Sequence, residues 1–300
     1  MDVAQKAEIL IEALPYIRTF WDQIVVVKYG GNALAGAAPA SSGTGGGEAA
    51  ALSSFATDIV LMLSVGMRPV VVHGGGPQIG EMMSRLGKVS EFVNGLRVTD
   101  EDTLDIARMV LVGKVNRDIV AAINVHGALA VGVSGEDAGI LNAAAKDPEL
   151  GFVGEVSSVN PDLLVRLLGD GLIPVVATIG ADTAGQSYNI NADTAAGAIA
   201  AALRASKLVY LTDVDGVRAD RHDPSTRISA ATTEMLRDLI EQGLVEGGMI
   251  PKVLSCVEAV EAGVARAHIL DGRQPHALLL EIFTREGVGT MVASSEETGP

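Results

Sequence analysis

Two glycine turns near the start of the chain combine residue types suited to phosphate chemistry. The apolar run 24–27 leads to Lys28, which is followed closely by Gly30 and Gly31. Glycine allows a bulky group to approach backbone N–H groups, and N–H groups beside a fixed cation suit a polyphosphate. A salt-bridged lysine beside an ordinary turn is the alternative. A second apolar run leads to a triple glycine turn, Gly74, Gly75 and Gly76. The two turns together predict two anionic groups held face to face.

A second lysine follows a glycine pair late in the chain. Lys252 comes shortly after Gly247 and Gly248. Two lysines on opposite sides of a transferring phosphoryl group would neutralise its oxygens electrostatically. The chain contains no G-x-x-x-x-G-K-[ST] segment, so a Walker-type phosphate loop is excluded.

Two amides and a carboxylate precede an alanine-rich helix. Alternation along an extended segment places Asn189, Asn191 and Asp193 on one side of the chain. Such a cluster can hold a substrate amide and orient lysines. Alternatively, Asn191 caps the helix and Asp193 occupies its first turn.

Two further segments have the residue types of binding sites. Arg97, in Asn-Gly-Leu-Arg-Val-Thr, can bind a carboxylate with both arms of its guanidinium, although a lone arginine is more often a surface or ion-pair residue. A buried strand ends in a turn that contains Thr212, Asp213, Asp215, Gly216 and Val217. This turn would lie beside a nucleotide-sized crevice. The two aspartates can equally be turn formers.

The rest of the chain alternates apolar strands with amphipathic helices. This alternation predicts an α/β fold with a mainly parallel sheet covered on both faces. Strands are expected near 24–27, 69–73, 129–133, 173–177, 207–211 and 266–270. Helices are expected near 4–20, 48–64, 78–86, 102–125, 161–169, 192–204, 232–242 and 251–262. Short alternating pieces around 152–156 and 186–190 are expected to add hairpins.

Two segments stand apart from this pattern. Residues 4–20 place apolar side chains on one helical stripe, which Pro15 should bend or interrupt. That stripe packs either on its own domain or against another subunit. Residues 35–47 are rich in Gly, Ala and Ser and predict a flexible loop.

Composition limits the range of partners and compartments. The 300 residues are 48% hydrophobic, enough for a full core in one or two domains. The net charge of −15 disfavours nucleic acid and anionic membranes, so local cations must hold any anionic ligand. The single cysteine, Cys256, is expected in the core and excludes an intrachain disulfide. With no membrane-length apolar run and no signal-peptide pattern, a cytoplasmic protein is expected.

Five of these motifs, in this order, resemble the amino acid kinase family, and within it the branch that acts on N-acetylglutamate. The resemblance covers residues 23 to 294 and rests on Lys-Tyr-Gly-Gly-Asn-Ala, His-Gly-Gly-Gly-Pro, Asn-Gly-Leu-Arg-Val-Thr, Asn-Ile-Asn-Ala-Asp and Gly-Gly-Met-Ile-Pro-Lys. It implies a three-layer αβα sandwich in which residues 23–300 form the kinase domain. The part before about residue 180 would bind the substrate and the part after it would bind ATP.

The resemblance implies ATP-dependent phosphorylation of the side-chain carboxylate of N-acetyl-L-glutamate, which gives N-acetyl-L-glutamyl 5-phosphate on the route to arginine. Lys28 and Lys252 would stabilise the transition state, and Asp193 would orient them. The substrate would lie on Gly74, Gly75, Gly76, Arg97 and Asn189, with Asn191 close to Asp193. ATP would lie on Gly30, Gly31 and the turn from Thr212 to Val217. Mg²⁺ would be held mainly by ATP oxygens and water, with no dedicated protein ligands.

The resemblance also implies regulation. Arginine-inhibited members have an extra N-terminal helix that links dimers into a hexamer, and residues 1–22 look like that helix. The segment 280–290 resembles their arginine site. Feedback inhibition by L-arginine is therefore expected, with Tyr16, His268, Glu281 and Gly287 near the effector. The sequence leaves open whether a PII-type signalling protein binds.

Two other functions remain as alternatives. The first is a kinase of a related amino-acid carboxylate, such as an aminoadipate derivative, because Arg97 and Asn189 would serve either substrate. The second is a non-catalytic arginine-sensing module, since the same fold forms the regulatory half of acetylglutamate synthases. The presence of Lys28, Asp193 and Lys252 disfavours the sensing module.

Overall fold

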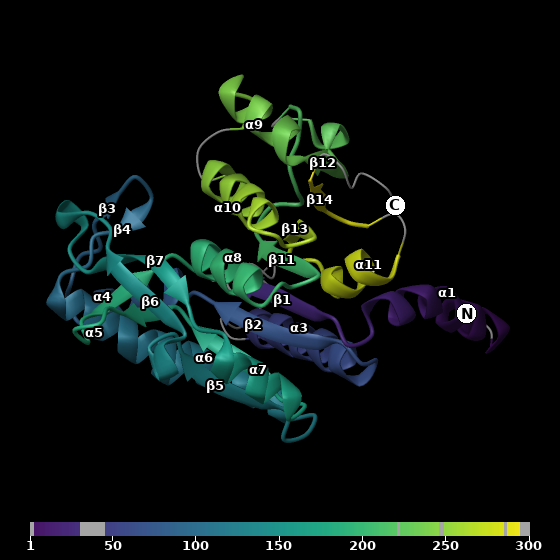
Figure 1. The fold of residues 1–300 in the computed structure, drawn as a ribbon, viewed down its shortest axis with the longest axis horizontal. Helices are drawn as coiled ribbons and strands as arrows, with labels where there is room; N and C mark the ends of the chain where they lie inside the picture. The colour runs from purple at the N-terminus through teal and green to yellow at the C-terminus, as the bar shows by residue number, and fades with distance from the viewer. Residues whose placement is uncertain (1–2, 31–45, 221–222, 246–248, 285–286, 295–300) are drawn as a thin grey trace.

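An eight-stranded sheet forms the centre of the computed structural model. The structure describes residues 3–30, 46–220, 223–245, 249–284 and 287–294. The strand order of the sheet is β12-β14-β13-β11-β1-β2-β8-β5 (Figure 1). The bounds are β1 Ile24–Tyr29, β2 Arg68–His73, β5 Ala130–Ser134, β8 Ile173–Ala177, β11 Lys207–Thr212, β12 Ala230–Thr232, β13 Arg266–Asp271 and β14 Thr290–Ala293. Strands β13, β11, β1, β2, β8 and β5 run parallel, whereas β14 is antiparallel to β13. The predicted mainly parallel sheet is confirmed.

Helices cover both faces of this sheet, so the predicted three layers are also confirmed (Figure 1). One face carries α7 (Asp162–Gly169), α8 (Ala192–Ala202), α9 (Thr233–Glu241) and α10 (Met249–Glu261). The other carries α3 (Gly46–Ser64), α4 (Gly76–Arg85), α5 (Glu101–Arg108), η1 (Met109–Val115), α6 (Asn116–Asn124) and α11 (Ala277–Phe283). The expected helix 102–125 is one continuous run, but its middle, η1, is a π-helix. Residues 35–45 of the glycine-rich segment lie outside the described residues.

The alternation of side chains along β1 separates two hydrophobic cores. Val26 packs with α8 and α10, whereas Val25 and Val27 pack with α3 and α6 on the opposite face. Successive strand residues point to opposite faces, so Lys28 must share the face of Val26. The sequence of this strand thereby directs its lysine toward α8 and α10.

A small closed barrel stands beside the main sheet. Its strands are β6 (Leu141–Ala145), β7 (Val153–Val159), β9 (Ile179–Ala181) and β10 (Ser187–Ile190). The prediction that the pieces near 152–156 and 186–190 add hairpins is confirmed, because β7 pairs antiparallel with β6 and β10 pairs antiparallel with β9. The closure of these two hairpins into a barrel, through the parallel pairing of β7 with β10, was not predicted. The hairpin β3 (Phe92–Val93) and β4 (Leu96–Arg97) was not predicted, since its two-residue strands are too short to show a period. Within the described residues, short 3₁₀ turns lie at Asp137–Gly139, Pro148–Leu150 and Pro224–Thr226.

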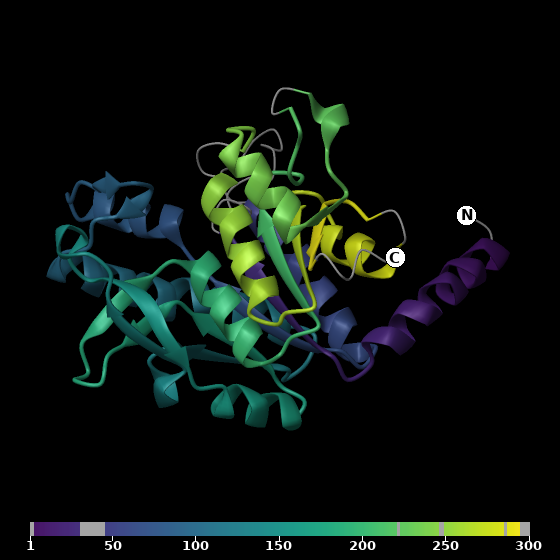
Figure 2. The ribbon, with the colours of Figure 1, turned by 45° about the horizontal axis from the view of Figure 1, so that its top comes forward.

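The N-terminal helix α1 (Val3–Phe20) extends away from the body of the molecule, as Figures 1 and 2 both show. The expected interruption at Pro15 does not occur, because the helix continues through it. Apolar side chains of this segment face solvent in the single chain, since Ile11 is 67% exposed and the adjoining Trp21 is 62% exposed. None of the described helices combines the length and the apolar character needed to cross a membrane.

Helix α7 provides a direct test of the core assignment. Leu164 is fully buried, whereas its neighbour Val165 is half exposed. Replacing Leu164 with Ala removes buried methyl groups and leaves a cavity, so we expect a loss of about 2–5 kcal/mol in the free energy of unfolding. Val165→Ala, the control on the same helix, should change it by no more than about 0.5 kcal/mol. Urea unfolding followed by circular dichroism measures both, and equal losses would contradict the packing described.

Candidate active site

A cavity of about 320 Å³ opens at the carboxyl ends of β1, β2 and β11. Parallel α/β sheets commonly bind ligands at this edge. Several elements contribute to its lining, among them both glycine turns, the β3–β4 hairpin, the barrel strands β7 and β10, and the starts of α8 and α10. The predicted residues that line it are Lys28, Gly30, Gly74, Gly75, Gly76, Arg97, Asn189, Asn191, Asp193, Thr212, Asp213 and Lys252. Segments far apart in the sequence therefore meet at one site.

One carboxylate joins the two predicted catalytic lysines. The Nζ atom of Lys28 lies 2.6 Å from Oδ1 of Asp193, and the Nζ atom of Lys252 lies 3.3 Å from Oδ2. Lys28 and Asp193 are both buried. Burial alone would raise the pKa of Asp193, but the charges of Lys28 and Lys252 outweigh it and lower that pKa. Asp193 is therefore ionised at neutral pH and fixes two cations at the edge of the cavity.

The position of Asp193 follows from the helix cap that precedes it. Asn191 is the N-cap of α8, and its side-chain oxygen accepts hydrogen bonds from the backbone N–H groups of Asp193 and Thr194. An N-cap of this type stabilises the first turn of a helix. Asp193 in that turn also lies at the positive end of the helix dipole. Asn191 thus performs the capping role, and it also lines the cavity.

The first glycine turn leaves no room for a side chain. A Cβ atom at Gly30 would lie 2.8 Å from the carbonyl oxygen of Leu211 and 3.2 Å from Nζ of Lys28. The backbone N–H of Gly30 donates to that same carbonyl at 3.2 Å. The close approach of Leu211 and Lys28 therefore requires a glycine at position 30, where β1 ends. Gly31, predicted to bind ATP, lies outside the described residues.

Arg97 is held against the second glycine turn. Its Nη2 atom donates to the carbonyl oxygen of Gly76 at 2.9 Å, and its Nη1 atom donates to Ser90 Oγ. The guanidinium lies 4.7 Å from the centre of the Phe92 ring. Burial lowers the pKa of Arg97 below its usual value. Arg97 is thus a partly desolvated cation on the wall of the cavity, rather than the surface arginine of the alternative interpretation.

Asn189 completes the polar wall from the barrel. Strand β10 pairs with β7 and β9, which fixes the backbone on both sides of Asn189. Its Nδ2 atom lies 3.4 Å from Thr99 Oγ1. Asn189 therefore lines the same cavity as the two lysines, from a strand that is paired on both sides.

The aspartate-rich turn divides into two parts. Thr212 and Asp213 line the cavity, whereas Asp215, Gly216 and Val217 are not among its lining residues. Asp215 forms two hydrogen bonds of 3.0 Å with Arg218. The N–H of Val217 donates to Thr290 Oγ1 at 2.8 Å. This part of the turn is held in place by Arg218 and Thr290.

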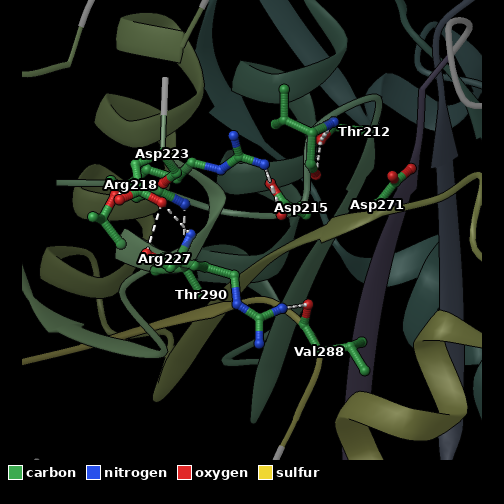
Figure 3. A network of polar contacts seen from close by, with 12 residues as sticks. Thr212, Asp215, Arg218, Asp223, Arg227, Asp271, Val288 and Thr290 are labelled. Carbon is green, nitrogen blue, oxygen red and sulfur yellow. Dashed lines mark hydrogen bonds and ion pairs between the residues drawn. The ribbon is translucent and has the colours of Figure 1, made fainter. Parts of the chain in front are cut away.

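Figure 3 shows how that supporting turn connects to the C-terminal strand. Arg227 donates to the carbonyl oxygen of Val288, and its backbone pairs with Arg218 in an isolated β-bridge. Thr290, the first residue of β14, donates to the carbonyl of Ile228. Hydrogen bonds therefore link the turn after β11 directly to the segment 288–290.

A second charged cluster lies at the opposite end of β11 and β13. Lys207 Nζ lies 2.9 Å from His268 Nε2, and His268 Nδ1 lies 2.7 Å from Glu281 Oε1. A lysine ammonium can only donate, so Nε2 accepts and Nδ1 carries the proton that is donated to Glu281. The other oxygen of Glu281 accepts from the N–H groups of Val288 and Gly289.

Burial sets the ionisation of this second cluster. Burial and the charge of Lys207 lower the pKa of His268 to about 4, so its imidazole is neutral at neutral pH. Burial also lowers the pKa of Lys207 to about 8. Burial opposes the ionisation of Glu281, but its hydrogen bonds prevail and lower its pKa to about 2. The result is an ammonium, a neutral imidazole and a carboxylate in one buried row.

The structure brings together three of the four residues predicted for the effector site. His268 and Glu281 are in contact, and Gly287, with φ of +58°, directly precedes Val288. Tyr16 is half-buried on α1, one turn before Phe20. Phe20 lies with its ring 4.9 Å from Lys207 Nζ. Sequence reasoning missed Lys207 and Phe20, since a lysine at the start of a strand gives no signal of its own.

No group of three or more His, Cys, Asp or Glu in the part of the chain that the structure describes could hold a metal ion. Both oxygens of Asp193 already face lysine ammonium groups. The donor set present in the cavity therefore does not form a protein cage for a divalent cation.

Comparisons of sequence identify the relatives of this chain. Residues 23–271 match the model of the amino acid kinase family. The chain is 51% identical to the acetylglutamate kinase of Pelotomaculum thermopropionicum, over 96% of this chain and 98% of that protein. It is 53% identical to the acetylglutamate kinase of Symbiobacterium thermophilum, over 96% of this chain and 97% of that protein.

Solved structures agree. An N-acetylglutamate synthase from Neisseria gonorrhoeae, complexed with coenzyme A and L-arginine, matches with a TM-score of 0.79 and 28% identity, over 96% of this chain and 65% of that longer chain. A carbamate kinase from Giardia lamblia bound to AMP-PNP shares the fold, with a TM-score of 0.66 and 16% identity over 91% of this chain and 99% of that one. The chain belongs to the amino acid kinase family.

Proposed function

We propose that this protein transfers the γ-phosphoryl group of ATP to the side-chain carboxylate of N-acetyl-L-glutamate. A carboxylate oxygen forms a bond to the γ-phosphorus, and the bond from that phosphorus to the β–γ bridging oxygen breaks. The products are ADP and the acyl phosphate N-acetyl-L-glutamyl 5-phosphate. The observation that carries the proposal is the single buried carboxylate of Asp193 between two lysines, at the edge of a cavity that also holds Arg97 and Asn189.

The residues present suit a reaction that needs charge neutralisation and no proton transfer. The substrate carboxylate is already ionised at pH 7, so no general base is required. Lys28 and Lys252 can approach the transferring group from two sides and neutralise the charge on its oxygens. Asp193 keeps both ammonium groups in place between turnovers. This arrangement places most of the catalytic effect in electrostatics fixed before the reaction begins.

Two halves of the chain would supply the two substrates. Arg97 and Asn189 are suited to the carboxylate and amide groups of acetylglutamate, and the glycine turn 74–76 offers N–H groups at the start of α4. The segment from about residue 180 onward, with Thr212 and Asp213 on the cavity wall, would bind ATP. Mg²⁺ would be held by phosphate oxygens and water, since both oxygens of Asp193 face lysines.

The first test of the proposal is a direct assay of the product. Hydroxylamine traps an acyl phosphate as a hydroxamate, and ADP formation is measured in parallel. Incubation with ATP, Mg²⁺ and N-acetyl-L-glutamate should give equal amounts of both. N-acetyl-L-aspartate and N-acetyl-L-2-aminoadipate are the comparison substrates. Turnover of the aminoadipate derivative alone would move the assignment to that substrate, and no turnover of any carboxylate would favour a sensing module.

Alanine substitutions test the roles of the two lysines. Lys28→Ala and Lys252→Ala should each lower kcat by roughly 10²–10³-fold with a smaller change in KM, because the charge they meet develops during transfer. The same assay measures both constants. Lys114→Ala is the control, since Lys114 is an exposed lysine that pairs with Asp118. An unchanged kcat in both site variants would sink the mechanism.

We further propose that L-arginine inhibits the enzyme by binding beside the cluster of Lys207, His268 and Glu281. A guanidinium pairs well with a carboxylate, and Glu281 is ionised there. Phe20 joins this cluster to α1, and Val288 joins it through Arg227 to the turn behind the nucleotide wall. The exposed apolar residues of α1 support an oligomerisation role for residues 1–22, as in a hexamer built from dimers.

The regulatory proposal predicts a specific loss of arginine sensitivity. L-arginine should reduce the rate of hydroxamate formation, and Glu281→Gln should raise the half-inhibitory arginine concentration by about tenfold or more, because a charge-assisted hydrogen bond is lost. Each variant is compared with its own rate without arginine. Glu241→Gln, an exposed acidic residue, is the control. Wild-type activity indifferent to arginine would remove the regulatory proposal and leave the kinase.

A further inference from the structure

A histidine that no step of the reaction uses is buried directly beside the substrate cavity. His73 is the last residue of β2, is fully buried, and immediately precedes the triple glycine turn. Its Nδ1 atom lies 3.0 Å from the carbonyl oxygen of Gly74. Its Nε2 atom lies 3.1 Å from Nδ2 of Asn116. Both ring nitrogens of a completely buried imidazole thus have defined partners.

The partners of Asn116 determine which nitrogen of His73 carries the proton. Arg117 donates from Nη2 to Asn116 Oδ1, and an arginine can only donate. The Nδ2 atom of Asn116 donates to the carbonyl of Val175 at 2.8 Å and faces His73 with its other hydrogen. His73 Nε2 is therefore the acceptor, and Nδ1–H donates to the carbonyl of Gly74.

The charge state of His73 agrees with this assignment. Burial, opposed in part by the hydrogen bond to Gly74, lowers the pKa of His73 to about 4, and the nearby charge of Arg117 acts in the same direction as burial. The imidazole is thus neutral at neutral pH. It acts as a fixed dipole with one donor and one acceptor.

The π-helix η1 supplies both sides of this arrangement. Asn116 follows η1 directly, and Leu111 within η1 packs so closely on Gly75 that a Cβ there would lie 2.7 Å from its Cδ2 atom. Gly132 lies on β5, which is separated from β2 by β8 in the sheet. Because Gly132 has no side chain, it leaves the space that Asn116 Oδ1 and the Arg117 guanidinium occupy. π-Helical turns are frequent at functional sites. The same irregular helix therefore fixes the glycine turn and orients the amide beneath it.

Holding the carbonyl of Gly74 also fixes the N–H of Gly75. The two groups belong to one planar trans peptide, so they point in opposite directions. The carbonyl faces the buried imidazole, and Gly75 lines the cavity. Gly75 is also the N-cap of α4, and the N–H groups at a helix start have no intrahelical acceptor.

We propose that His73 is a positioning residue, which through Nδ1–H holds the Gly74 carbonyl and thereby aims the Gly75 N–H at the oxygens of the transferring phosphoryl group. Asn116 is the residue that keeps Nδ1 the protonated nitrogen. This role rests on the proposed kinase function, and it assigns the buried end of the His-Gly-Gly-Gly-Pro segment to the alignment of a transition-state donor.

Three substitutions of His73 separate alignment from packing. In His73→Asn, the amide Nδ2 takes the place of Nδ1 and can still donate to Gly74. His73→Gln places its amide at the position of Nε2, and His73→Leu has no donor.

We expect kcat to fall by about 10- to 100-fold in the Gln and Leu variants. This loss is smaller than the roughly 10²–10³-fold loss when an oxyanion donor is removed outright. KM for acetylglutamate should stay within about threefold, and His73→Asn should recover most of kcat. Equal losses in all three variants, or a rise in KM alone, would overturn the proposal.

The ring proton is tested independently of catalysis. The protein contains five histidines, and the ring resonances of His73 are those missing from the ¹H–¹⁵N spectrum of His73→Asn. A long-range ¹H–¹⁵N spectrum of the wild-type protein should show a neutral ring protonated at Nδ1. A proton on Nε2, or a charged ring, would overturn the assignment even if all variants were inactive. An inactive wild-type protein would instead remove the kinase function, whatever the tautomer.

Discussion

The buried carboxylate of Asp193 is the interaction on which the site depends. A charge removed from water is costly unless it is paired, and here one carboxylate meets two ammonium groups from β1 and α10. The pairing places three distant segments in one arrangement and leaves one positive charge in excess beside the cavity. That excess gives a chain with a net charge of −15 a local site for anions.

The sheet makes this pairing possible by separating two cores. Alternation along β1 directs Val26 and Lys28 to the layer of α8 and α10, while Val25, Val27 and Tyr29 face the layer of α3. The helix cap at Asn191 then places Asp193 in the first turn of α8, next to the carboxyl end of β1. Strand period and helix capping are local rules, yet together they determine how the ammonium groups of Lys28 and Lys252 are placed around Asp193.

These local rules explain what the sequence could predict. The periods of the main strands and helices are long enough to read, so the layers and the parallel sheet were predicted, and Lys28, Asp193 and Lys252 were recognised as one set. The closed barrel and the β3–β4 hairpin were not, because their strands are short and their pairing is decided by tertiary contacts. The π-helix, Lys207 and the roles of His73 and Asn116 were missed for the same reason, since a buried polar residue is recognisable only by its partners.

The wide separation of Lys28 and Lys252 along the chain has a consequence for folding. Contacts between residues distant in sequence form late, because closing the intervening chain has an entropic cost. Lys28 lies on β1 and Lys252 on α10, so a chain synthesised only as far as α9 lacks one of the two cations of the site. The pair of cations around Asp193 therefore assembles only when β1, α8 and α10 have packed together.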